Sequence, residues 1–342
     1  MTDRFRSALS PHAASEHQPA SLSGLAAQAR DYAEAATSAN TRRAYDADWR
    51  HFSAWCRHEN LDPLPPHPQT IGLYLTACAT GAKSVGGRRN AVSTIERRLS
   101  ALSTVYMSKG LVLERRDRHI ALVMAGIRNT HGRPPVQKAA LMPEDLIAML
   151  AVCERETLRG LRDRAILLIG FSGGLRRSEI TGLDGGRDQT SDGLGWVEFM
   201  EKGLLITLRG KTGWREVEIG PGTTPATCPI TALRDWMKRA GIRQGPLFRR
   251  IWPDGMEIGP MRLNDREVAR VVKRLAVLAG VADPRDERMY AGHSLRAGLA
   301  SSAEADERLV QKQLGHSTAE MTRRYQRRRD RFRVNLTRAA GL

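Results

Sequence analysis

Apolar residues recur every three or four positions through the first part of the chain, which is the period of an amphipathic helix. The clearest stripe is formed by Val92, Ile95, Leu99, Leu102 and Tyr106. The same spacing predicts helices over 40–56, 70–78 and 120–129, the first capped by an Asn or Thr at 40 or 41. Because no alternating strand pattern occurs before residue 190, we expect the first 130 residues to be all-helical.

The pattern changes to strict alternation after residue 190, which favours strands. Leu204, Ile206 and Leu208 alternate up to a Gly-Lys-Thr-Gly turn that contains Lys211, and apolar residues at 217 and 219 alternate after the turn. Helical spacing returns afterwards; further helices are predicted over 143–150, 163–171, 229–240, 264–279 and 293–325. The predicted fold is mainly α, with a helical N-terminal domain and an α+β domain that contains a small antiparallel sheet.

Composition places the domain boundaries. Residues 1–23 are rich in Ser, Ala, His, Pro and Gln without an apolar period, so we expect a disordered tail. The helical domain then covers 24–129, and 130–139, with its glycine and prolines, is typical of a linker. Residues 140–342 form the second domain. Its last segment carries a basic run and then an apolar stripe, formed by Phe332, Leu336, Ala339, Ala340 and Leu342, which predicts docking onto a partner surface.

The charge balance points to nucleic acid. The chain has 54 basic and 37 acidic residues, a net charge of +17, and a sequence pI near 10.5. Its four cysteines match neither a zinc-ligand spacing nor a redox pair, so we interpret them as buried apolar residues in a reducing cytoplasm. No apolar run is long enough to span a membrane, and no export signal precedes the helices.

Residues suited to phosphate chemistry gather near the C-terminal end. His293 and Arg296 are one helical turn apart, and His316 and Tyr325 follow. Arginine donates two parallel hydrogen bonds to an oxyanion, histidine exchanges a proton near neutral pH, and tyrosine offers a hydroxyl nucleophile. Upstream, Arg176 lies in a Gly-Leu-Arg-Arg-Ser-Glu segment.

The order Arg176, Lys211, His293-x-x-Arg296, His316, Tyr325 resembles the tyrosine recombinase, or phage integrase, family. The resemblance runs from about residue 40 to 335 and includes the Asn-Thr-Arg-Arg-Ala-Tyr segment at 40–45. It is closest to the two-domain, Cre-like pattern, although Cre-like members can carry Trp at the position of His316.

The resemblance implies a role for each of these residues. Arg176 and Arg296 would hold the non-bridging oxygens of a DNA phosphate, and Tyr325 would attack the phosphorus. Lys211 would protonate the leaving oxygen, with Lys202 as its competitor. His293 and His316 would contact the phosphate or accept the tyrosine proton, and Glu179 would hold a neighbouring side chain. No cofactor is implied, and no Asp/Glu cluster or His set has metal-ligand spacing.

Other basic residues are candidates for DNA contact outside the chemistry, although a solvated basic surface explains each one nearly as well. They precede or begin helices, and they are Lys83, Arg88, Arg89, Arg97, Arg98 and Arg266.

The function implied by these residues is site-specific recombination of double-stranded DNA by a homotetramer on paired sites. We expect it in the cytoplasm of a bacterium or its phage, at the nucleoid. Three alternatives stay open at this point: a type IB topoisomerase, a catalytically silent DNA-binding protein of the same fold, and a metal-dependent nuclease. The target site, and the choice between integration, excision and resolution, also stay open.

Overall fold

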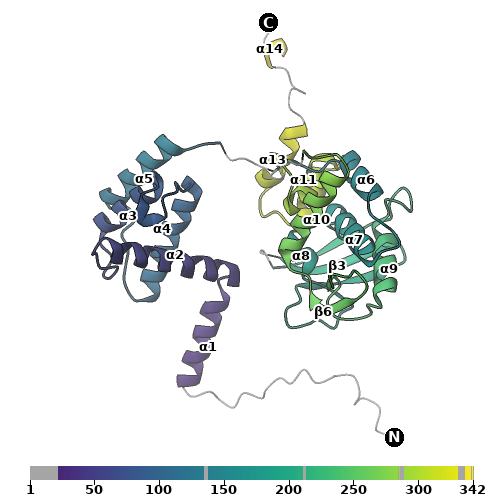
Figure 1. The fold of residues 1–342 in the computed structure, drawn as a ribbon, viewed down its shortest axis with the longest axis horizontal. Helices are drawn as coiled ribbons and strands as arrows, with labels where there is room; N and C mark the ends of the chain where they lie inside the picture. Colours follow the sequence, from purple (N-terminus) through teal and green to yellow (C-terminus); the bar gives the residue numbers. More distant parts are fainter. Residues whose placement is uncertain are drawn as a thin grey trace. The chain divides into compact units, whose positions relative to one another are not determined.

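A computed structural model describes residues 22–134, 138–210, 213–283, 285, 289–329, 336–339 and 341. It separates into two compact units, Met1–Pro135 and Val136–Leu342 (Figure 1). The predicted mainly helical fold with a small sheet is confirmed.

The first unit is helical throughout its described part. Its elements are α1 (Leu22–Ala35), α2 (Ala39–His58), α3 (Pro68–Thr80), a 3-10 turn (Lys83–Val85), α4 (Val92–Ser108) and α5 (Arg118–His131). Helix α2 begins earlier than predicted, because the Ser38 side chain rather than Asn40 or Thr41 caps it, accepting from the backbone N–H of Thr41 at 3.2 Å. Helix α1 begins at Leu22, inside the segment predicted to be disordered.

The predicted stripes form the core of this unit. Ile95, Leu99 and Leu102 of α4 are buried against aromatic side chains of α2 and α3. Phe52 and Tyr74 meet edge to face, with ring centroids 5.0 Å apart. The core therefore arises from the apolar faces that the sequence pattern identified.

Helices α3 and α5 pack closely at Gly72, where a side chain would collide with the carbonyl oxygen of His119. We expect Gly72→Ala to destabilise this unit by about 1–3 kcal/mol through overpacking. Gly126→Ala is the matched control, since that helical glycine in α5 has open space around it and should gain about 0.5–1 kcal/mol. Denaturant unfolding of the two variants measures both changes; destabilisation of equal size would contradict the close approach.

The second unit packs a four-stranded sheet together with its helices in one hydrophobic core (Figure 1). Its helices are α6 (Pro143–Ala151), α7 (Leu158–Ser172), α8 (Arg177–Thr181), α9 (Pro229–Ala240), α10 (Asp265–Leu278), α11 (Gly292–Ser302), α12 (Glu307–Leu314), α13 (Ala319–Arg329) and α14 (Leu336–Ala339). The stretch 293–325, predicted as one helical segment, is divided between α11, α12 and α13. All four cysteines of the chain are free and buried, as expected.

The sheet has the order β1-β2-β3-β4, with strands β1 (Leu183–Gly185), β2 (Gly195–Met200), β3 (Gly203–Gly210) and β4 (Gly213–Ile219). Strands β2 to β4 are antiparallel, as predicted. The sequence showed no strand signal before residue 190, but β1 lies there and pairs in parallel with β2. The sequence pattern also did not predict a separate hairpin, formed by β5 (Arg249–Ile251) and β6 (Ile258–Arg262). Strands β1 and β5 have three residues each, which is too short to display a period.

Candidate active site

Four segments of the second unit bring the predicted catalytic residues together. Arg176 directly precedes α8, and His293 and Arg296 lie in the first turns of α11. His316 follows α12, and Tyr325 lies in α13, which packs against both α11 and α12. These helix contacts bring His293, Arg296, His316 and Tyr325 together. Arg176 lies within electrostatic reach of His293 and Arg296, so it belongs to the same site.

Tyr325 lies between the two histidines of its own chain. Its hydroxyl is 2.5 Å from Nε2 of His293. Its ring stacks on that of His316, with centroids 5.9 Å apart and planes 10° from parallel. Partial burial and the guanidinium groups of Arg296, Arg176 and Arg177 lower the pKa of His293, so its ring is largely neutral at pH 7. A neutral imidazole in this position can accept the phenol proton.

Arg296 is fully buried, with 1% of its surface exposed, and it joins two loops of the site. One guanidinium nitrogen donates to the Gly174 carbonyl at 2.6 Å, and the other donates to the Leu314 carbonyl. Burial, followed by the charge of Arg176, lowers the pKa of Arg296 to about 10, so it remains a cation at neutral pH. The loops before Arg176 and before His316 are therefore tied to α11.

Glu179 holds Arg176 by two contacts. Its Oε1 accepts from Nη1 of Arg176 at 2.6 Å, and its Oε2 accepts from the Arg176 backbone N–H at 2.7 Å. Burial alone would raise the pKa of Glu179, but the Arg176 backbone N–H and the guanidinium groups of Arg215 and Arg176 hold it below its ordinary value. The charged carboxylate of Glu179 thus fixes Arg176. The sequence predicted this role for Glu179, as a residue that holds a neighbouring side chain.

Arg215 is a site residue that the sequence did not predict. It lies on β4, and its Nη2 donates to Oε2 of Glu179 at 3.1 Å. Its other terminal nitrogen donates to the backbone carbonyl of Gln313 at the end of α12. The only sequence signal is its place four residues after Lys211, on the strand that leaves the turn.

His316 is buried and held by α13. Its Nδ1 lies 2.9 Å from the Thr322 hydroxyl, and only 7% of the residue is exposed. Burial, followed by the charges of Arg296 and Arg176, lowers the pKa of His316 to about 4. The ring is therefore neutral across the physiological range.

This pKa has a consequence for stability. Between pH about 4 and 6.5 the unfolded chain protonates His316 while the folded protein does not, so stability should rise with pH across that window. We expect the difference in unfolding free energy between wild type and His316→Gln to change over this window and to be constant above it. Urea unfolding between pH 4 and 8 measures it; a difference that does not vary with pH would contradict the low pKa.

Lys211 lies outside the described residues, but its neighbours do not. Gly210 ends β3 next to Glu179, since a methyl group built on Gly210 would lie 3.5 Å from Oε1 of Glu179. The competitor Lys202 lies in the β2–β3 turn, at the other end of β3. A strand of this length separates Lys202 from Gly210 by roughly 25 Å. The geometry around the site thus favours Lys211 over Lys202.

The predicted DNA-contact residues differ in their settings. Lys83, Arg88 and Arg89 are exposed ahead of α4, and Arg266 is exposed in the first turn of α10. Arg97 is exposed and paired with the buried Asp48.

The structure corrects the prediction that Arg98 is a candidate for DNA contact. Its guanidinium turns into the first unit, where it donates to the Tyr74 hydroxyl at 3.1 Å and to the sulfur of Cys78 at 3.1 Å. It therefore supports the interior rather than a phosphate.

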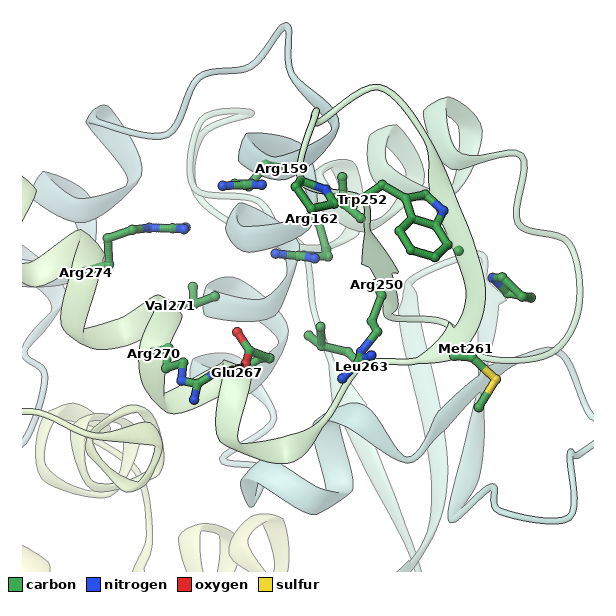
Figure 2. Close-up of a pocket in the computed structure, with 14 residues that line it drawn as sticks. Arg159, Arg162, Arg250, Trp252, Met261, Leu263, Glu267, Arg270, Val271 and Arg274 are labelled. Carbon is green, nitrogen blue, oxygen red and sulfur yellow. Dashed lines mark hydrogen bonds and ion pairs between the residues drawn. The ribbon is translucent and has the colours of Figure 1, made fainter.

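A cavity of about 490 Å³ lies apart from this site, between α7, α10 and the β5–β6 hairpin (Figure 2). Its lining is rich in arginine, including Arg159, Arg250 and Arg270, and it contains none of the predicted catalytic residues. The candidate active site is instead the group of side chains around Tyr325, outside this cavity.

Much of the C-terminal stripe falls outside the described residues or their described side chains; Ala339 of α14 is exposed. Among the described residues, no helix is long and apolar enough to cross a membrane.

Known proteins resemble this chain in sequence. The family model described as "Phage integrase family" matches residues 140–331, which include Arg176, both histidines, Arg296 and Tyr325. The integrase/recombinase xerD homolog of Selenomonas ruminantium is 30% identical over 322 residues, covering 91% of this chain and 88% of that protein. The tyrosine recombinase XerC of Syntrophus aciditrophicus is 27% identical, covering 84% and 87%.

Solved structures share the fold. A lambda integrase dimer bound to a COC′ core site matches with a TM-score of 0.56 at 15% identity, covering 90% of this chain and 95% of that one. The XerH recombinase bound to palindromic difH substrate matches with a TM-score of 0.53 at 18% identity, covering 81% and 72%. Since the family model spans more than half of the sequence and the xerD homolog matches nearly all of it, the chain belongs to the phage integrase family, the tyrosine recombinases.

Proposed function

We propose that this protein is a site-specific recombinase that cuts and rejoins DNA through a covalent bond between Tyr325 and a 3′-phosphate. The observation that carries the proposal is the hydroxyl of Tyr325, which lies 2.5 Å from Nε2 of His293 and within electrostatic reach of Arg296. Its relatives are named recombinases and integrases, so a topoisomerase or a silent DNA-binding protein is not favoured.

In the proposed reaction, Arg176 and Arg296 hold the non-bridging oxygens of the scissile phosphate as negative charge builds up on them. Glu179 supports this role, because it fixes the Arg176 guanidinium in one orientation. Arg296 contributes a cation that is already positioned by two backbone carbonyls. Both positive charges are therefore in place before the phosphate arrives.

Attack by Tyr325 on the phosphorus forms the phosphotyrosine bond and breaks the bond to the 5′-oxygen. His293 accepts the phenol proton, and Lys211 donates a proton to the leaving oxygen. His316, neutral and stacked on Tyr325, contributes hydrogen bonding without a competing charge. Attack by the 5′-hydroxyl of a partner strand then reverses these steps and rejoins DNA without ATP.

Selection of bound sequences from random DNA, followed by an exchange assay on two copies of the selected site, tests the function. We expect recombinant products in EDTA with no nucleotide added. A protein that relaxes supercoils on a single site but never exchanges strands would be a topoisomerase instead.

We also propose that the enzyme works as a homotetramer on paired sites, in a bacterial cytoplasm at the nucleoid. The apolar positions after Tyr325 support the oligomer, because DNA does not bury an apolar stripe. We propose that this tail docks onto a neighbouring subunit and links the states of their tyrosines.

Truncation after Arg331 tests the tail. We expect near-normal binding of one half-site, because the site residues remain, but a joint loss of tetramer assembly and recombination. Mobility-shift assays on half-sites and paired sites, with full-length protein as the control, separate these steps. Normal recombination, or a loss of half-site binding, would rule out docking between subunits.

A further inference from the structure

Arg215 connects three parts of the site through one side chain. It lies on β4, which pairs with β3 from Gly210 and Gly213 onward. Its guanidinium donates to Glu179 at 3.1 Å and to the carbonyl of Gln313. Because two nitrogens of one planar group make these contacts, the distance between Glu179 and the end of α12 is fixed.

The backbone around Arg215 is shaped to receive it. Gly315 ends α12 in the left-handed region, with φ of +59°, and directly precedes His316. A methyl group at Gly315 would lie 2.7 Å from Cδ and 2.8 Å from Nε of Arg215, so only glycine leaves room for the arginine. The loop that presents His316 is thus built against Arg215.

The end of α12 is also held on β4 and α11. The Gln313 amide donates to the Glu218 carbonyl of β4 at 3.1 Å. The Leu314 carbonyl accepts from Arg296. Arg215 therefore lies between the two halves of the site, with Glu179 and Arg176 on one side and His316 and Arg296 on the other.

We propose that Arg215 is a positioning residue of this site, which holds Arg176 through Glu179 and holds His316 through the end of α12. This inference rests on the proposed recombination function. Arg215 contributes no proton and no phosphate contact in this account. It sets the separation between the first arginine and the second histidine, where an error of about 1 Å costs about 10²-fold in rate.

Arg215→Met tests the proposal in the full-length protein, with cleavage of a nicked substrate as the assay. We expect a loss of about 10²-fold in cleavage rate with near-normal half-site binding. Glu179 keeps its contacts with Arg176 in this variant, so its carboxylate is not left unpaired. Arg187→Met is the matched control, because Arg187 pairs with Glu198 at 2.8 Å on the surface, and it should cleave at the wild-type rate.

A double-mutant cycle with Glu179→Gln distinguishes positioning from general stability. If Arg215 acts through Glu179, Arg215→Met should cost much less in the Glu179→Gln protein than in the wild type. Fully additive losses would overturn the proposal. The His316 pKa gives a second signal: removing the nearby cation should raise it from about 4, which NMR titration detects.

Failure of the positioning role can be distinguished from failure of the proposed recombinase function. If Arg215→Met cleaves like wild type, the positioning role is wrong while the recombinase assignment stands. If wild type itself forms no covalent complex, the proposed function fails first. Should the Met variant not fold, Arg215→Lys decides, because lysine keeps the charge but cannot donate two forked hydrogen bonds; a wild-type rate in that variant would overturn the role.

Discussion

Replacing Tyr325 by Phe is expected to abolish covalent attachment to DNA while leaving binding unchanged. The hydroxyl is the proposed nucleophile. Removing the nucleophile of an enzyme can cost on the order of 10⁶-fold in rate. The ring remains, so its stacking on His316 and the packing of α13 should persist. On a nicked substrate whose short fragment diffuses away, wild type should accumulate a protein–DNA adduct and the variant none.

Tyr290→Phe is the matched control for this loss. Tyr290 is buried, and its hydroxyl donates to Asp145 at 3.1 Å, a residue outside the proposed chemistry. Its variant should form the adduct normally. An adduct that persists in Tyr325→Phe would remove Tyr325 from the mechanism, and peptide mapping of that adduct would identify the true nucleophile.

Lys211→Ala is expected to slow cleavage by about 10²- to 10⁴-fold, the usual contribution of a general acid. Replacing the bridging 5′-oxygen by sulfur should restore the rate, because a thiolate leaves without a proton. The sulfur substitution should not restore the cleavage rate of Arg176→Ala, because that variant lacks a group that holds the non-bridging oxygens. Single-turnover cleavage of the two substrates measures the effect.

Lys202→Ala completes this experiment. Lys202 occupies the turn at the far end of β3, so its variant should cleave both substrates at the wild-type rate. Sulfur rescue of Lys202→Ala, or equal rescue of Lys211→Ala and Arg176→Ala, would place the acid elsewhere.

The sequence predicted those parts of the fold whose signal is local. The α4 stripe and the alternation of β3 each lie within one element, so periodicity was sufficient. Strand β1 has three residues, and its pairing with β2 is set by tertiary contact, so the pattern could not reveal it. Arg98 could have been recognised as internal, since it lies three after Ile95 and four before Leu102 on the apolar face.

The residues of the candidate site also fall into two groups, those that the sequence predicted and one that it did not. Arg176, His293, Arg296 and Tyr325 stand in recognisable motifs, and the fold brings them together. Arg215 stands in no motif, because its partners Glu179 and Gln313 lie 36 and 98 residues away in sequence. A residue that acts by joining distant segments becomes visible only when those segments have been placed in space.

The guanidinium groups of Arg176, Arg215 and Arg296 all lie within electrostatic reach of the Glu179 carboxylate. This local excess of positive charge costs stability in the free protein, and a DNA phosphate arriving there acts as a counter-ion. Because every phosphodiester carries the same charge, this attraction cannot distinguish one sequence from another. Discrimination between DNA sites therefore has to come from surfaces away from the chemistry, so target choice and reaction rate can change independently of one another.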